Sequence, residues 1–305
     1  MSANVAVAVP GSTANLGSGF DCVAIAVERW VHVTARRAPG GSAMRFERHG
    51  VLAALSGPDA EDLLYRGFVR ACEAAGAAPP AVVLDARSDI PIGRGLGSSA
   101  AAVVAGAATA RVLCDLSLDD AALIALCAEI EGHPDNVAAS VRGGAILVLG
   151  APGGSGWQVA PLEVHASLAL VFAVPEFTLS TERARAALPP TVPHHTAAQA
   201  VARSAALVLG LARADAGLLA AGLDDLLHVP ARRALVRGYD EVTAAAHQAG
   251  AFGATLSGSG PALVAVASAA RAAAVEAGMA EAWRSLGVSV ATFRGTAAVG
   301  GCRVA

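Results

Sequence analysis

Residues 91–110 read PIGRGLGSSAAAVVAGAATA, and this stretch predicts a glycine-rich turn that leads directly into a helix. The first turn of a helix exposes unpaired N–H groups and a partial positive charge, which suits an anion. Glycines let the backbone approach a phosphate closely, and successive N–H groups in such a turn form an anion-binding nest. We therefore expect this loop to hold a di- or triphosphate.

The loop lacks the lysine of the P-loop pattern GxxxxGK[ST], and so does the whole chain, in which all 22 basic residues are arginine. Backbone dipoles and a metal ion can replace that charge, since Mg²⁺ prefers hard oxygen ligands such as the serine hydroxyls at positions 98 and 99. A Rossmann site is a poor match because Gly93, Gly95 and Gly97 alternate and do not meet GxGxxG. Taken alone, the stretch is equally compatible with a capped turn that binds nothing.

Composition limits the class of protein. The 305 residues allow one large domain or two of ordinary size, with a net charge of −3 and no basic run, which argues against a nucleic-acid or membrane-surface partner. Mean hydropathy is +0.53, but the apolar runs at 100–110 and 205–212 are shorter than the ~20 residues of a membrane span. No basic segment precedes an apolar one at the N-terminus, so we expect no signal peptide. The five cysteines form no CxxC pair, which favours a reduced, cytoplasmic protein. The oligomeric state, a homodimer included, is left open.

Hydrophobic periodicity predicts an α+β chain. Strands are expected at 5–9, 23–33, 81–84, 145–149, 168–174 and 288–293 and on both sides of the loop in 253–267, and helices at 62–75, from 98, from 119, at 196–222 in two pieces, at 233–248 and at 269–286. Proline and glycine should stop the first strand at Pro10 and end the helix from 119 at 131–136. The Gly- and Pro-rich residues 150–157 predict the joint between a domain of residues 1–155 and a domain of residues 156–305.

Two further glycine–serine loops follow predicted strands. They are PGSTANLGSGFD at residues 10–21, which contains Asn15 and Asp21, and LSGSGPA at residues 256–262. Each loop taken singly is most often just a turn, but three such loops at the ends of strands could line one cleft.

Three stretches, VAVPGSTANLGSGFD (7–21), PIGRGLGSSAAAVVAG (91–106) and GATLSGSGPALVAVA (253–267), resemble the signature motifs of the GHMP kinases, a family named for galactokinase, homoserine kinase, mevalonate kinase and phosphomevalonate kinase. EGHPDNVAAS (131–140), STERARAALP (180–189) and DLLHVPARRAL (225–235) resemble the members that act on homoserine. The resemblance implies a ribosomal-protein-S5-like domain followed by a ferredoxin-like domain. It also implies ATP-dependent phosphorylation of the side-chain hydroxyl of L-homoserine to O-phospho-L-homoserine, in L-threonine biosynthesis. The alternatives are another small-molecule kinase of the family, such as an L-threonine kinase, and a catalytically silent binding protein.

The resemblance also implies where ATP and Mg²⁺ bind. The phosphates would lie against Pro91, Ile92, Gly93, Arg94, Gly95, Leu96, Gly97, Ser98, Ser99, Ala100 and Ala101. Ser99 and Glu131 would hold Mg²⁺, with Glu129 as the alternative. The family often has asparagine near the adenine where this chain has Asp62, which leaves that contact open.

An amino-acid carboxylate calls for arginine, whose planar fork binds it with two hydrogen bonds. Arg185 and Arg232 match the substrate arginines of the family, with Arg233 as the alternative register. The other substrate contacts that the resemblance implies are Asn15, Asp21, Asn136, Thr181, Gly258, Ser259 and Gly260. His133 and His228 are expected to be structural.

Ser99, Glu131, Asn136 and Asp21 form the expected catalytic group. Mevalonate-type members carry an aspartate where this chain has Asn136, and an amide is no base near neutral pH. We therefore expect a reaction without a dedicated base, in which Asp21 binds the substrate ammonium. Asp135 is the neighbouring carboxylate, and the sequence does not indicate where it points.

Overall fold

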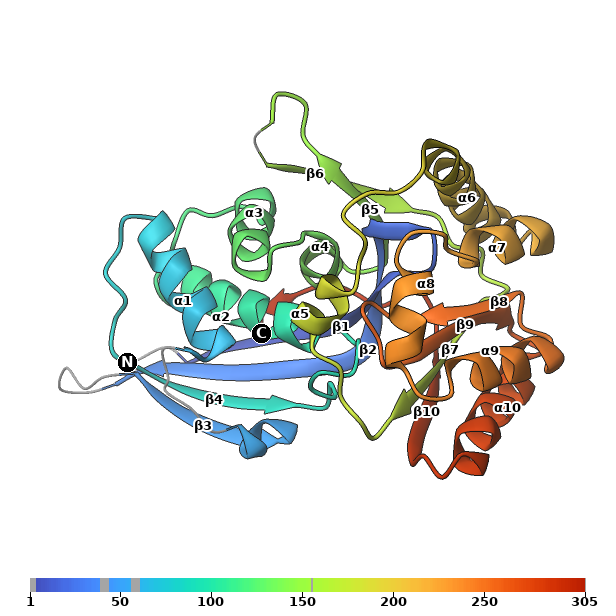
Figure 1. Cartoon of the computed structure of the whole chain (residues 1–305). Coiled ribbons are helices and arrows are strands. Elements are labelled where there is room, and N and C mark those ends of the chain that lie inside the picture. The colour runs from blue at the N-terminus through green and yellow to red at the C-terminus, as the bar shows by residue number, and fades with distance from the viewer. Residues whose placement is uncertain (1–3, 39–43, 56–60, 155, 305) are drawn as a thin grey trace.

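The computed structural model describes residues 4–38, 44–55, 61–154 and 156–304, which form two β-sheets and the helices around them (Figure 1). The first sheet contains β1 (Val5–Asn15), β2 (Gly19–Arg37), β3 (Arg45–Gly50), β4 (Val82–Ser88), β5 (Ala145–Gly150), β6 (Trp157–Leu162) and β11 (Arg303–Val304). The second sheet contains β7 (Leu168–Pro175), β8 (Gly253–Leu256), β9 (Leu263–Ser268) and β10 (Val290–Gly295). The α-helices are α1 (Leu63–Ala74), α2 (Ser98–Leu113), α3 (Asp120–Glu131), α4 (Asp135–Arg142), α5 (Thr181–Ala186), α6 (His194–Arg213), α7 (Ala216–Leu223), α8 (Val229–Arg232), α9 (Tyr239–Gln248) and α10 (Ala272–Ser285).

The strand β1 carries the first glycine–serine motif to the end of the first sheet. The prediction that Pro10 stops this strand is wrong, because β1 continues to Asn15 and pairs with β2 throughout. A register shift between Pro10 and Gly11 accommodates the proline, as a β-bulge does. The bulge therefore leaves the pairing intact and delivers Asn15 to the turn before β2.

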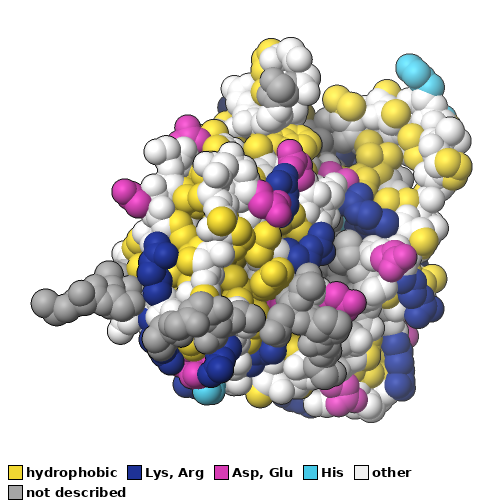
Figure 2. Space-filling model, turned by 90° about the vertical axis from the view of Figure 1, so that its left-hand side faces the viewer, with side chains coloured by type: hydrophobic (Ala, Val, Ile, Leu, Met, Phe, Trp, Pro, Cys, Tyr) yellow, Lys and Arg dark blue, Asp and Glu magenta, His cyan; other side chains and the backbone are white. Residues whose placement is uncertain are grey.

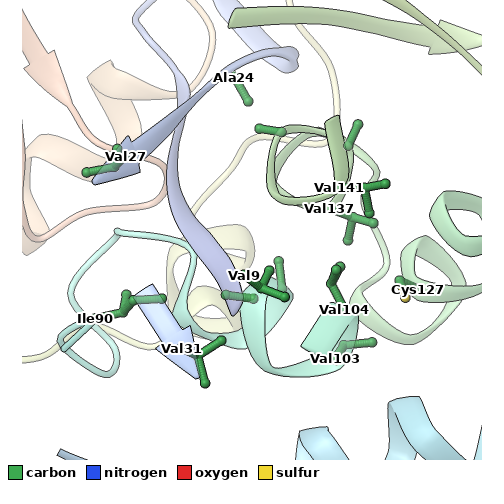
Figure 3. Packing of buried hydrophobic residues seen from close by; sticks show 14 of the residues in the cluster. Val9, Ala24, Val27, Val31, Ile90, Val103, Val104, Cys127, Val137 and Val141 are labelled. Atoms are coloured by element: carbon green, nitrogen blue, oxygen red, sulfur yellow. The ribbon is translucent and has the colours of Figure 1, made fainter. Parts of the chain in front are cut away.

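Helices α1 to α4 cover one face of the first sheet (Figure 1). Figure 3 shows Val103 and Val104 of α2 beside Val137 and Val141 of α4, close to Val9 of β1. All of residues 103–110 of α2 are buried, so this helix is enclosed and not amphipathic. Its alanines and its one glycine, Gly106, keep the helix narrow enough for that position.

The second sheet has the order β10-β7-β9-β8 and is antiparallel, which is the strand order of a ferredoxin-like sheet. Every residue of β7 is buried. Leu170 and Phe172 point toward the core of the first sheet, whereas Val171 and Ala173 join the core under α9 and α10. The second sheet thus lies between these helices and the first sheet, and one apolar core spans both.

The change of sheet occurs between Leu162 and Leu168. The predicted joint at residues 150–157, of which residue 155 lies outside the described ranges, forms the turn of the β5–β6 hairpin inside the first sheet. The chain also returns to that sheet at its end, because Val304 of β11 pairs with Val7. A division at residues 155 and 156 therefore does not follow the sheets.

Two other predictions need correction. The helix expected at 233–248 is a 3₁₀ turn (Arg233–Leu235) followed by α9, because Gly238 at φ 80° separates them. Residues 131–136 were expected only to end the helix from 119, but a further helix, α4, begins there at Asp135. Within the described residues no helix is long and apolar enough to cross a membrane. On the side that carries α1 and β3, arginine and acidic side chains are interspersed around apolar ones (Figure 2).

Candidate active site

The three glycine–serine loops meet at one cavity of about 470 Å³. Residues from each loop line it: Asn15 and Asp21 from the first, Gly93, Gly95, Gly97, Ser98 and Ser99 from the second, and Gly258 and Ser259 from the third. Gly260 does not line it. A cavity of this volume lies within the range of small-molecule sites. The expectation that the three loops lie together is therefore met by the geometry.

The backbone N–H groups of the second loop have no acceptor among the described residues, and several of the loop residues line the cavity. Gly93, Gly95 and Gly97 all have positive φ, between 66° and 79°, and alternate with ordinary residues. The loop carbonyls bind elsewhere, because those of residues 93, 94, 95 and 96 accept from Leu179 N, Ala262 N, Ser257 Oγ and Ser12 N respectively. Among the described residues, no acceptor meets the backbone N–H groups of residues 93–100. This arrangement is a nest at a helix N-terminus and suits a phosphate chain.

Not every predicted phosphate-loop residue reaches the cavity. The Arg94 guanidinium donates to the carbonyl of Pro175 at the end of β7 and does not line the cavity. Pro91, Leu96, Ala100 and Ala101 are also absent from its wall. The side chain of Arg94 therefore anchors the loop to the second sheet.

Ser99 and Glu131, the residues predicted to hold a metal ion, lie in direct contact. The hydroxyl of Ser99 donates to Oε2 of Glu131 over 2.7 Å. Burial is the main cause that raises the pKa of Glu131, and the Ser99 hydrogen bond opposes it only in part. Glu129, the alternative, is exposed and pairs with Arg70. A site with two protein oxygens suits Mg²⁺, because this ion usually keeps several water ligands.

The two arginines have different environments. Arg185 forms a bidentate ion pair with Asp21, with distances of 3.1 and 3.2 Å. Arg232 lines the cavity although it is only 2% exposed. Arg233 points to solvent and pairs with Asp240. The geometry therefore favours Arg232 over Arg233 as the residue that faces a ligand.

The side-chain amides hold the loops in place. Asn15 donates to the carbonyl of Gly258 over 2.8 Å and accepts from the Asp21 N–H over 2.9 Å, so it joins the first loop to the third. Asn136 Oδ1 accepts from the Ser12 hydroxyl over 2.8 Å. Thr181 Oγ1 lies 3.4 Å from Ser259 Oγ at the rim. Much of the hydrogen-bonding capacity of Asn15 is therefore already used.

Asp135 and His133 are cavity residues that the sequence analysis did not place among the binding or catalytic residues, and His133 was expected to be structural. The first residue of α4, Asp135, is 1% exposed, and its Oδ1 lies 2.7 Å from His133 Nδ1. Its Oδ2 has no hydrogen-bond partner among the described residues. Burial lowers the pKa of His133, but the hydrogen bond and charge of Asp135 and the charge of Glu131 raise it overall. Their position beside Asn136 in GHPDN was the only signal for them.

Asp62 lines the cavity, and its carboxylate already has partners within the protein. Its Oδ1 accepts from the Leu64 N–H at the start of α1, and its Oδ2 pairs with Arg48 at 2.7 Å. Apolar side chains form much of this end of the cavity, among them Phe46, Leu52, Leu55 and Ile92. An aromatic base would therefore meet an apolar wall here.

Known families and proteins match this chain along most of its length. The family described as the GHMP kinases N terminal domain matches residues 62–144, and that described as GHMP kinases C terminal matches residues 207–285. Homoserine kinase of Trichormus variabilis is 40% identical over 285 residues, which cover 93% of each chain. Homoserine kinase of Nostoc sp. is 39% identical over 293 residues, which cover 94% of each chain.

Comparison with solved structures also finds a homoserine kinase, together with other proteins of the same fold. The crystal structure of homoserine kinase from Cytophaga hutchinsonii superposes with a TM-score of 0.89 at 28% identity and covers 99% of this chain and 97% of that one. A mevalonate kinase from L. major, at 17% identity and a TM-score of 0.71 over 93% of this chain and 94% of its own, shares the fold. Family matches over more than half of the sequence, and relatives of this identity along nearly its whole length, show that the chain belongs to the GHMP kinase family.

Proposed function

We propose that this protein transfers the γ-phosphoryl group of ATP to the side-chain hydroxyl of L-homoserine, which yields O-phospho-L-homoserine for L-threonine biosynthesis. One observation carries the proposal: a single cavity joins the glycine-rich second loop to a group of charged side chains that includes Arg185, Arg232, Asp21 and Asp135. The loop suits the phosphates, while Arg185, Arg232, Asp21 and Asp135 suit the carboxylate and ammonium of an amino acid. The relatives named as homoserine kinases support this substrate.

The charged groups are arranged for a zwitterion. Arg185 and Asp21 pair with each other, so an amino acid that carries both charges can exchange with this pair and leave neither side unpaired. Arg232 offers a buried cation, and Asp135 Oδ2 offers a free acceptor. A substrate that lacks the carboxylate or the ammonium would leave Arg232 or Asp135 without a partner of opposite charge. An unpaired buried ion is unfavourable.

The chemistry rests on alignment. The substrate oxygen forms a bond to the γ-phosphorus, the bond to the bridging oxygen of ADP breaks, and the hydroxyl proton passes to an oxygen of the transferred phosphoryl group. Mg²⁺, which we propose to be held by Ser99 and Glu131, supplies charge stabilisation to the phosphates when bound. The free N–H groups of residues 93–100 provide fixed dipoles toward the same charge. The Asn136 amide orients and does not accept a proton, so we propose that no dedicated base is needed.

Location and assembly complete the proposal. All five cysteines are free thiols, which supports a cytoplasmic location. We propose a homodimer as the assembly to test, and the mass in solution decides it.

The test is ATP consumption with a panel of L-homoserine, L-threonine and L-serine, with the product identified by mass spectrometry. We expect the highest kcat/KM with homoserine and a product phosphorylated on the side-chain oxygen. A higher kcat/KM with threonine would reassign the substrate. Absence of turnover with every acceptor in the presence of ATP and Mg²⁺ would favour the silent binding protein.

A further inference from the structure

Two hydrogen bonds and one aromatic ring hold the guanidinium of Arg232. Its Nε donates to the carbonyl of Ala184 over 3.2 Å, and its Nη1 lies 3.2 Å from Nδ1 of His228. The ring of Phe20 lies 5.2 Å from the guanidinium carbon. No described residue accepts from Nη2, although Arg232 lines the cavity. This nitrogen is therefore left for a ligand.

These contacts fix the tautomer of His228. A guanidinium can only donate hydrogen bonds, so Nδ1 of His228 must be unprotonated and accept. The proton of the neutral ring then lies on Nε2, which is 3.1 Å from the carbonyl of Gly17, a group that can only accept. Burial is the main cause that lowers the pKa of His228, which favours the same neutral ring.

The position of the ring is also fixed. His228 is fully buried and stacks on Phe20, with 4.9 Å between ring centroids. Asp225 Oδ2 accepts from the backbone N–H groups of residues 227, 228 and 229, which holds the backbone of His228. Gly17 belongs to the turn between β1 and β2, the same turn that carries Asn15 and leads to Asp21. His228 thus connects the loop of Asp21 to the guanidinium of Arg232.

Arg232 has no described carboxylate as a direct partner, although the charges of Asp21, Asp225 and Asp135 act on it from further away. Among the described residues, no carboxylate forms an ion pair with Arg232, and its one side-chain acceptor is the neutral imidazole. A carboxylate at that place would orient the guanidinium but would also neutralise it, and so compete with a carboxylate ligand. A neutral acceptor orients the guanidinium and leaves its charge for the ligand.

We propose that His228 is a positioning residue for substrate specificity: its neutral ring accepts from Arg232 and directs the free edge of the guanidinium toward the carboxylate of the amino acid. This inference rests on the proposed function, because it takes homoserine as the ligand of Arg232. If His228 only filled space in the core, the acceptor at Nδ1 would not matter for substrate binding.

The amides of asparagine and glutamine separate these roles. Asparagine places an oxygen near the position of Nδ1, so His228→Asn keeps an acceptor for Arg232 and loses the donor to Gly17. Glutamine places its amide near the position of Nε2, so His228→Gln keeps the donor and loses the acceptor. Steady-state kinetics with L-homoserine, and with 3-aminopropan-1-ol as substrate or competitor, measure the effect. This second compound is homoserine without its carboxylate.

We expect His228→Gln to raise KM for homoserine by roughly tenfold or more, the scale of a hydrogen bond to a charged group. Its kcat should stay within about threefold and its KM for ATP within about twofold. The affinity for 3-aminopropan-1-ol should not change, because that ligand has no carboxylate. His228→Asn should retain most of the preference for homoserine, and Arg232→Ala should lose it as His228→Gln does.

Two substitutions serve as controls, namely Arg233→Ala, next to Arg232 but paired with Asp240, and His247→Gln on the exposed side of α9. Both should match the wild type. Equal losses in His228→Asn and His228→Gln, or a loss that extends to 3-aminopropan-1-ol, would overturn the positioning role. If His228→Gln does not fold, His228→Asn alone decides, since a loss of homoserine preference as large as that of Arg232→Ala contradicts the proposal. A wild type that does not turn over homoserine would instead overturn the proposed function and this inference with it.

Discussion

Glu131 is a largely buried carboxyl group, and the direction of its pKa shift determines how the free energy of unfolding changes with pH. Because burial raises its pKa above the ordinary 4.5, the folded chain binds more protons than the unfolded chain between 4.5 and the raised value. The free energy of unfolding without metal should therefore fall as pH rises through that window. A divalent cation at Ser99 and Glu131 would offset this cost at neutral pH.

Replacement of Glu131 by Gln tests both effects. The variant should lose the share of the pH dependence of the unfolding free energy that Glu131 contributes in EDTA, measured by urea titration between pH 5 and 7.5. Its kcat should fall by roughly 10²-fold, with a smaller change in nucleotide affinity, because the backbone nest is intact. Glu129→Gln, on the exposed side of the same helix, should change neither quantity. An equal loss of nucleotide affinity and turnover in Glu131→Gln would contradict the metal role.

Asp21 and Asp135 are the two cavity carboxylates that could act on the substrate hydroxyl, and their amides decide whether a base exists. Without a dedicated base, Asp21→Asn and Asp135→Asn should each mainly raise KM for homoserine and leave kcat within about tenfold. A fall in kcat of roughly 10²–10⁴ at saturating homoserine, with loss of an acidic limb in the pH profile, would identify the altered residue as the base.

At the scale of elements, the fit between the second and third loops depends on Gly95. A Cβ at this position would lie 2.3 Å from the carbonyl oxygen of Ser257, and its φ is +79°. We expect Gly95→Ala to push the loops apart, raise KM for ATP by roughly tenfold or more and cost about 1–3 kcal/mol of unfolding free energy. Gly76→Ala is the matched control, because φ is +68° there and no atom lies within 4 Å of the added Cβ. It should cost about 1 kcal/mol and leave KM for ATP unchanged. Similar KM values for the two variants would show that strain alone, and not the loop contact, matters.

The elements that the sequence did not predict have physical reasons in common. In the GHPDN segment, Gly132 does end α3, with φ of 80°, but Pro134 precedes the first turn of α4, where a proline is tolerated. With only eight residues, α4 shows too little periodicity to be recognised. The strand β3, RFERHG, is mostly exposed and so lacks an apolar pattern. By contrast, the glycine–serine loops could be recognised from their residue types and from their resemblance to the family motifs.

The proximity of side chains was the least predictable feature. Asn15 and Gly258 are 243 positions apart and yet share a hydrogen bond, and no local pattern encodes such a distance. The register between Arg232 and Arg233 was open in the sequence for the same reason, since only the packing of α8 turns one of them inward. The residue types of the site could thus be inferred from their chemistry, whereas their partners required the fold.

For the whole molecule, the two sheets behave as one structural unit. The buried side chains of β7 that face the first sheet, Leu170 and Phe172, belong to the same apolar cluster as Val9 and Val104. The last strand, β11, pairs with β1, and the N–H of Cys302 donates to the carbonyl of Ser140 in α4. The end of the chain therefore supports the helix that carries Asp135 and Asn136.

This continuity predicts that the fragments 1–155 and 156–305 do not fold separately. The first fragment would lack β6 and β11, which leaves β5 and β1 without their outer partners, and the second would expose one whole apolar face of β7. Each fragment alone should show no cooperative thermal transition by circular dichroism and no ATP turnover. As the control, a protease site in the β5–β6 turn at residues 152–154 should give a nicked chain that stays folded and active, because the cut itself disturbs no strand pairing. Sharp and independent melting of both fragments would show that the division at residues 155 and 156 is a true domain boundary and that the shared core contributes little.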